Sequence, residues 1–129
     1  MDSTIRLLLV DDEEDVTKLL CLRLARRGYA CVAAASGAGA LQCLREQLCH
    51  VVVMDVKMPG MDGIETLQHI RAAWPHLPVI LLSGHADMQT AVQAMQTGAF
   101  GYLMKPVDFD ELLFKIEDAA TQLRLEGNV

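Results

Sequence analysis

The chain has 129 residues, a formal net charge of -6 and a hydrophobic content of 52%, which is enough for one domain with a core of its own. Charged residues interrupt every apolar run before it could span a bilayer, so the composition argues against a membrane protein. The only adjacent basic pair is Arg26-Arg27, and we therefore expect no direct contact with nucleic acid.

The N-terminal residues and the cysteines indicate where the chain works. An acid stands at position 2 and no small-residue cleavage pattern follows, so the start does not resemble a signal peptide and a cytoplasmic location is the default expectation. The four cysteines lack C-x-x-C spacing and the four histidines lack metal-type spacing. We therefore expect neither a zinc site nor a redox pair, and interpret the cysteines as small hydrophobic residues in a reducing compartment.

Five short apolar segments predict strands. They cover residues 6–10, 30–34, 51–54, about 79–82 and 101–104, and most are rich in Val, Ile and Leu. Such runs are typical of strands that are buried on both faces of a parallel sheet.

A segment of helical periodicity follows each predicted strand. The first helix begins near Asp15 and stops at Gly28, the second follows Ser36 as N-cap, and the third runs from about Ile64 to Trp74. The apolar residues expected to face the core are Val16, Leu19, Leu20 and Leu24 in the first helix and Leu41, Leu44 and Leu48 in the second.

The last two helices are predicted in the same way. The fourth begins near Asp87 and ends at Gly98, and the fifth opens with the capping box Asp108-x-x-Glu111 and continues to Leu123. The expected core face of the fourth helix consists of Met88, Ala91, Val92 and Met95.

This alternation of strands and helices predicts an α/β fold. Right-handed crossovers would give a doubly wound parallel sheet with helices on both faces. We predict a flavodoxin-like sheet of five parallel strands in the order 2-1-3-4-5. Five helices would cover it, two on one face and three on the other. Residues 1–129 would form one domain, which could be a piece cut from a longer protein.

Polar residues follow four of the predicted strands directly. Asp11 and Asp12 follow the first strand, Asp55 the third, Ser83 the fourth and Lys105 the fifth. Since the carboxyl ends of parallel strands share one edge, these side chains should converge in one cleft.

This set of groups suits phosphoryl transfer. Two or three carboxylates suit Mg²⁺, which prefers oxygen ligands, and an Asp can act as a nucleophile toward phosphorus. Asp55 is the candidate nucleophile, Lys105 a second positive group, and Ser83 a hydrogen-bond donor to a phosphoryl oxygen. We also expect a cis peptide bond between Lys105 and Pro106, because the turn must direct Lys105 back toward Asp55.

The motifs match a known family in order and over essentially the whole chain. They are Val10-Asp11-Asp12-Glu13, Met54-Asp55-Val56-Lys57-Met58-Pro59-Gly60-Met61-Asp62-Gly63, Leu82-Ser83-Gly84 and Lys105-Pro106, and Pro59, Gly60 and Gly63 are expected to lie in a loop. Together they resemble the receiver domain of two-component response regulators. The pattern around residues 84–100 is most similar to receivers of transcription regulators of the sigma-54 activator type. Gly101 departs from this pattern, which often has Asp before the aromatic residue.

The resemblance implies specific roles. Asp11, Asp12, Asp55 and the backbone carbonyl of Lys57 would bind Mg²⁺, and a sensor histidine kinase or phosphotransfer protein would donate the phosphoryl group from a phosphohistidine. The domain would be a regulatory phosphoacceptor rather than an enzyme acting on a separate substrate, although it would catalyse its own phosphorylation and slow dephosphorylation.

The resemblance also implies a switch. Tyr102 would turn inward as Ser83 moves toward the phosphoryl group. The face formed by the fourth helix, fifth strand and fifth helix would then change, and that face could form a homodimer.

Three other interpretations compete with this one. A phosphatase of the haloacid dehalogenase type needs a second Asp two residues after its nucleophile, where this chain has Lys57. A flavodoxin-like cofactor binder needs a phosphate-binding loop after the first strand, where the acids beginning at Asp11 would repel a phosphate. A pseudo-receiver that is not phosphorylated usually loses part of the acid and lysine set, and this chain retains all of it.

Overall fold

The computed structural model describes residues 4–84 and 88–128, and its sheet is the one predicted. Five parallel strands have the order β2-β1-β3-β4-β5. Strands β3 and β4 each extend one residue beyond the prediction, so that Asp55 and Ser83 are the last residues of their strands. The strands are β1 Arg6–Val10, β2 Ala30–Ala34, β3 Val51–Asp55, β4 Val79–Ser83 and β5 Gly101–Met104.

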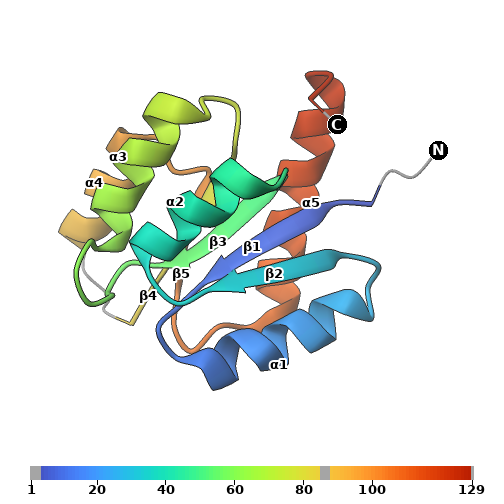
Figure 1. Cartoon of the computed structure of the whole chain (residues 1–129), viewed down its shortest axis with the longest axis horizontal. Coiled ribbons are helices and arrows are strands. Elements are labelled where there is room, and N and C mark those ends of the chain that lie inside the picture. Colours follow the sequence, from blue (N-terminus) through green and yellow to red (C-terminus); the bar gives the residue numbers. More distant parts are fainter. Residues whose placement is uncertain (1–3, 85–87, 129) are drawn as a thin grey trace.

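Five helices lie on the two faces of this sheet, as predicted. Helices α2, α3 and α4 cover one face, and α1 and α5 cover the other (Figure 1). Alternate residues of each central strand enter the two cores, because successive side chains of a strand point to opposite faces. The helices are α1 Glu14–Ala25, α2 Gly37–Glu46, α3 Gly63–Ala73, α4 Met88–Thr97 and α5 Phe109–Leu125.

Side-chain caps fix where three helices begin. The hydroxyl of Ser36 accepts a hydrogen bond from the Gly39 amide at the start of α2, as predicted. At α3 the carboxylate of Asp62 accepts from the Glu65 amide. The Asp108 carboxylate accepts from the amides of Asp110 and Glu111 at the start of α5, where the capping sequence was predicted. A cap of this kind stabilises a helix by about 1 kcal/mol.

Two leucines expected in the core are exposed instead. Helix α2 ends at Glu46 because Gln47 has an extended backbone, with its side chain accepting a hydrogen bond from Arg6. Leu48 therefore lies beyond the helix and is exposed. In α1 the residues buried in the core are Thr17 and Leu24, and Leu19 points to solvent.

The predicted core face of α4 is wrong. Met88, Val92 and Met95 are all exposed, and Ala94 is the buried residue of the helix. The expected start of α4 near Asp87 lies outside the described residues. Helical periodicity identifies a stripe of large apolar side chains, but it does not determine whether that stripe or a neighbouring stripe of small residues faces the sheet.

Within residues 4–84 and 88–128, no helix combines the length and the apolar character that crossing a bilayer requires.

Candidate functional site

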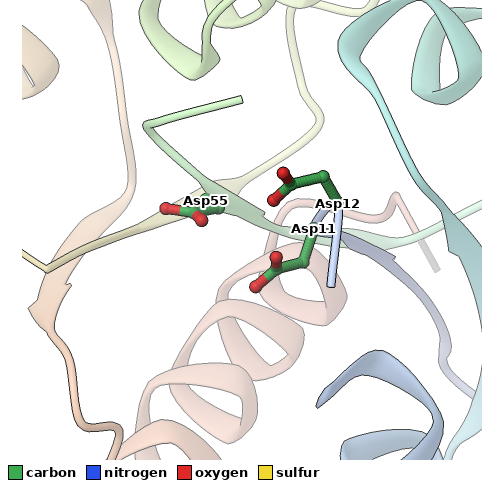
Figure 2. A group of neighbouring side chains, drawn as sticks. All are labelled: Asp11, Asp12 and Asp55. Atoms are coloured by element: carbon green, nitrogen blue, oxygen red, sulfur yellow. The ribbon is translucent and has the colours of Figure 1, made fainter. Parts of the chain in front are cut away.

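Two acids extend from the end of β1. The Asp11 amide donates to the carbonyl of Ala34 on β2, and its carboxylate accepts from the Glu13 amide at 2.9 Å. These bonds hold the Asp11 side chain, which is 4% exposed, at the edge of the sheet. Asp12 is exposed beside it, and both side chains approach Asp55 (Figure 2).

Asp55 lies at the centre of the same edge. It is the last residue of β3, between β1 and β4, and it is only 6% exposed. The Lys57 amide donates to its Oδ1 at 3.3 Å. Carboxylate oxygens of Asp11, Asp12 and Asp55 all lie within 4.8 Å of one another, so the three acids predicted to converge do so.

Lys105 joins two of these acids. Its Nζ lies 3.0 Å from Oδ2 of Asp11 and 3.0 Å from Oδ2 of Asp55. Burial lowers the pKa of Lys105, but hydrogen bonds and charge from Asp55 and Asp11 outweigh that effect, so its pKa lies above the ordinary 10.5. The peptide bond between Lys105 and Pro106 is cis, as predicted.

The charge and spacing of this cluster fit a divalent cation. Three carboxylates and one ammonium give the cluster a formal charge of −2. Two Mg²⁺ ligands at about 2.1 Å from the ion can be at most about 4.2 Å apart. Oxygens spread over up to 4.8 Å therefore need only small side-chain movements to share one ion. The acid cluster could bind a metal, and the Lys57 carbonyl remains a prediction as a further ligand.

Ser83 and Tyr102 lie on the neighbouring strands. Ser83 ends β4 and is 3% exposed, and its carbonyl accepts from the Lys105 amide at 2.8 Å. This bond connects the strand that carries Ser83 to the residue that contacts Asp55. Tyr102, on β5, is partly buried against the core that α2, α3 and α4 share. The structure places Ser83 beside the site and Tyr102 on the neighbouring strand, and their switching roles stay predictions.

Gly63 supports the site and begins α3, whereas the sequence predicted it to lie in a loop. Its amide donates to the carbonyl of Val56 at 2.7 Å. A Cβ on Gly63 would lie 2.5 Å from the Asp55 carbonyl oxygen and 2.8 Å from Cα of Val56. Only glycine lets α3 begin this close to the backbone of Asp55. Gly63 ends the motif that resembles the receiver family, but the sequence gives no indication of this contact with the Asp55 backbone.

Comparison with known proteins identifies the family. Residues 7–117 match the model of the response regulator receiver domain. The chain belongs to this family. A solved receiver domain from Clostridium thermocellum is 34% identical and superimposes with a TM-score of 0.89, covering 94% of this chain and 98% of that one. The flavodoxin-like fold predicted from the sequence is thereby confirmed.

Relatives also connect this receiver with transcription regulators. The transcriptional regulatory protein GlrR of Escherichia coli (strain K12) is 44% identical over 90% of this chain, but the match spans only 26% of GlrR. The beryllofluoride-activated receiver domain dimer of NtrC4 is 35% identical, with a TM-score of 0.86 and coverage of 91% of this chain and 97% of that one. The chain thus spans about a quarter of the length of the curated relative.

Proposed function

We propose that this receiver domain accepts a phosphoryl group on Asp55, in the presence of Mg²⁺, from a phosphohistidine of a sensor histidine kinase or phosphotransfer protein. The main support is the position of Asp55 at the end of the central strand, where one oxygen contacts Lys105 at 3.0 Å and the carboxylates of Asp11 and Asp12 lie close by. A single buried Asp after a strand would be weak evidence for this role. Three acids that converge beside a shared lysine are much stronger evidence.

In the proposed reaction, an oxygen of Asp55 forms a bond to phosphorus as the phosphorus–nitrogen bond of the donor breaks. The histidine nitrogen keeps the electron pair and takes a proton from solvent. Lys105 neutralises negative charge on the transferred group, and it can stay anchored through Asp11 when Asp55 becomes an acyl phosphate. Ser83 donates a hydrogen bond to a phosphoryl oxygen.

The metal would be held by Asp11, Asp12, Asp55 and the carbonyl of Lys57. When bound, Mg²⁺ supplies positive charge that offsets the acid cluster and the incoming phosphoryl oxygens. The same residues catalyse slow hydrolysis of the acyl phosphate, so the domain is a self-modifying regulatory unit.

Intact mass after incubation with acetyl phosphate tests this assignment. The wild-type protein should gain one phosphoryl group only when Mg²⁺ is present, and Asp55→Ala should gain none. Asp118→Ala, which removes an exposed acid of α5 far from the cluster along the helix, is the matched control and should react like wild type. Phosphorylation of Asp55→Ala at the wild-type level would refute the proposal.

We propose further that phosphorylation changes the surface formed by α4, β5 and α5. Ser83 moving toward the phosphoryl group would leave space that Tyr102 can fill from β5. Met88, Val92 and Met95 already expose an apolar stripe on α4, which a second copy of this domain or an output domain could cover. The output is transcription, of the sigma-54 activator type, and the domain works in the cytoplasm without contacting nucleic acid itself.

Amide exchange and sedimentation with and without beryllofluoride, in Mg²⁺, test this readout. We expect changed protection in residues about 88–115, because a ligand acts only by favouring one of two accessible states. Changes confined to the surroundings of Asp55 and α1 would contradict the proposed surface while leaving the phosphoacceptor assignment intact.

A further inference from the structure

The loop between β3 and α3, residues 56–62, alternates between buried and exposed side chains directly after Asp55. Val56 and Met58 are each 8% exposed, and both pack into the core that α2, α3 and α4 cover. Lys57, between them, is exposed. Met58 therefore ties the loop to the core one residue after Lys57.

Hydrogen bonds hold the backbone on the N-terminal side of Lys57. The Val56 amide donates to the carbonyl of Leu82 on β4 at 2.8 Å, and the Val56 carbonyl accepts from the Gly63 amide at 2.7 Å. The Lys57 amide donates to Oδ1 of Asp55 at 3.3 Å. These bonds keep the backbone of Lys57 beside the acid cluster.

The C-terminal side of Lys57 is held differently. No backbone–backbone hydrogen bond within residues 4–84 and 88–128 involves Met58, so its buried side chain is what fixes its place. Pro59 follows, and a proline restricts the residue before it to extended conformations. Burial of one side chain and a restricted backbone thus replace the hydrogen bonds found on the other side.

We propose that Met58 is a positioning residue for Mg²⁺. The Lys57 carbonyl, which the proposed site uses as a metal ligand, belongs to the planar peptide group that joins Lys57 to Met58. Burial of the Met58 side chain fixes one end of this group, and the bonds of Val56 fix the backbone before it. This inference rests on the proposed function of the site.

The benefit of such an anchor is entropic. Mg²⁺ demands near-ideal octahedral geometry, so each of its ligands must be held in one position when the ion binds. A carbonyl that the fold already holds loses little freedom on binding, whereas a mobile carbonyl must first be ordered. Met58 pays this ordering cost during folding instead of during metal binding.

Titration calorimetry of the full chain with Mg²⁺ tests the role of the side chain, with the free energy of unfolding measured separately without the ion. Met58→Ala removes the anchor, and the Kd for Mg²⁺ should rise about tenfold, roughly the cost of ordering the backbone of one residue. Met58→Leu conserves the buried volume and should keep the Kd within about twofold of wild type.

Met61→Ala is the matched control. Met61 lies in the same loop and packs partly buried against the same core, but it does not adjoin the Lys57 carbonyl. This variant should lower the free energy of unfolding while its Kd for Mg²⁺ stays close to the wild-type value. A purely structural role of Met58 would give the two alanine variants the same Kd.

Nuclear magnetic resonance observes the carbonyl itself in the wild-type protein. Lys57-Met58 is the only Lys-Met dipeptide in the chain, so carbonyl-labelled lysine combined with nitrogen-labelled methionine gives a single signal across this peptide bond. Addition of Mg²⁺ should shift the Lys57 carbonyl signal along the same binding curve as the calorimetry. The methyl signal of Met58 should stay in place, because the anchor is set before the ion binds.

The possible failures are distinguishable. A wild-type protein that does not bind Mg²⁺ would refute the proposed metal site and the role of Met58 together. Normal binding by Met58→Ala, or an equal loss of affinity in Met61→Ala, would overturn the role of Met58 and leave the metal site intact. A Lys57 carbonyl signal that Mg²⁺ does not shift, or a Met58 methyl signal that shifts with it, would do the same. These signals come from the wild-type protein and decide the question even if Met58→Ala does not fold.

Discussion

The ammonium of Lys105 lies 3.0 Å from the Asp55 carboxylate, although 50 residues of chain separate them, and it lies equally close to Asp11. Both carboxylates are almost fully buried. Removal of the shared cation would leave two buried negative charges uncompensated, which is more costly than loss of an exposed ion pair.

We expect Lys105→Met to lower the free energy of unfolding by about 1–3 kcal/mol at neutral pH. Mg²⁺ should restore part of this loss, because it would supply the missing positive charge. Urea denaturation with and without Mg²⁺ measures both effects. Lys18→Met, at an exposed position on α1, is the control, and equal destabilisation by the two variants would show that the shared contact contributes nothing.

The positions of the acids, the hydroxyl and the lysine could be predicted because each follows an apolar run directly, and parallel strands must end at one edge. Other features of the structure could not be predicted from the sequence. The close approach of Gly63 to the Asp55 backbone depends on how α3 packs against the end of β3. In α4 the small Ala94 is buried and the stripe of larger apolar residues is not. Tertiary packing decides which side of the helix faces the sheet, and the helical periodicity of the sequence does not determine it.

Asp12→Asn should have opposite effects in the absence and presence of Mg²⁺. Without the ion, removal of one of three crowded carboxylates relieves repulsion, and Tm should rise by about 1–2 °C. At a Mg²⁺ concentration of a hundredfold the Kd of the wild-type protein, the free energy of unfolding of the wild-type protein should rise by about 2.7 kcal/mol. That of the variant should rise much less. Thermal unfolding over a Mg²⁺ titration gives both values. Asp118→Asn should be stabilised by Mg²⁺ as much as the wild-type protein is. If Asp12→Asn is stabilised equally, Asp12 does not bind the metal.

Gly63→Ala should destabilise the protein by about 2–3 kcal/mol, because the new methyl group would overlap backbone atoms of the central strand that cannot move aside. Gly84→Ala is the matched control, since a Cβ there meets no atom of residues 4–84 and 88–128 within 4 Å. Chemical denaturation of both variants tests the contrast. If Gly63→Ala is as stable as Gly84→Ala, α3 can shift away from Asp55 at little cost.

His50 lies just before β3, at the opposite end of the sheet from Asp55. We expect it to make the free energy of unfolding depend on pH. Its Nδ1 accepts a hydrogen bond from the Arg6 amide at 2.9 Å, so the folded protein needs the neutral ring. Burial, with the charges of Arg6 and Arg124, holds the pKa of His50 below the ordinary 6.5. The unfolded chain therefore binds the proton more readily than the folded one. The contribution of His50 is complete above about pH 6.5 and is lost as pH falls from there through the folded pKa.

Unfolding by urea across pH 5 to 8 measures this dependence, and two variants isolate it. His50→Asn offers an oxygen acceptor to the Arg6 amide without a titrating ring, so it should lose less stability than wild type between about pH 6.5 and pH 5. His69→Gln removes an exposed histidine of α3 and should leave the pH profile unchanged. A His50→Asn profile that falls as steeply as the wild-type profile would show that His50 does not set the acid sensitivity.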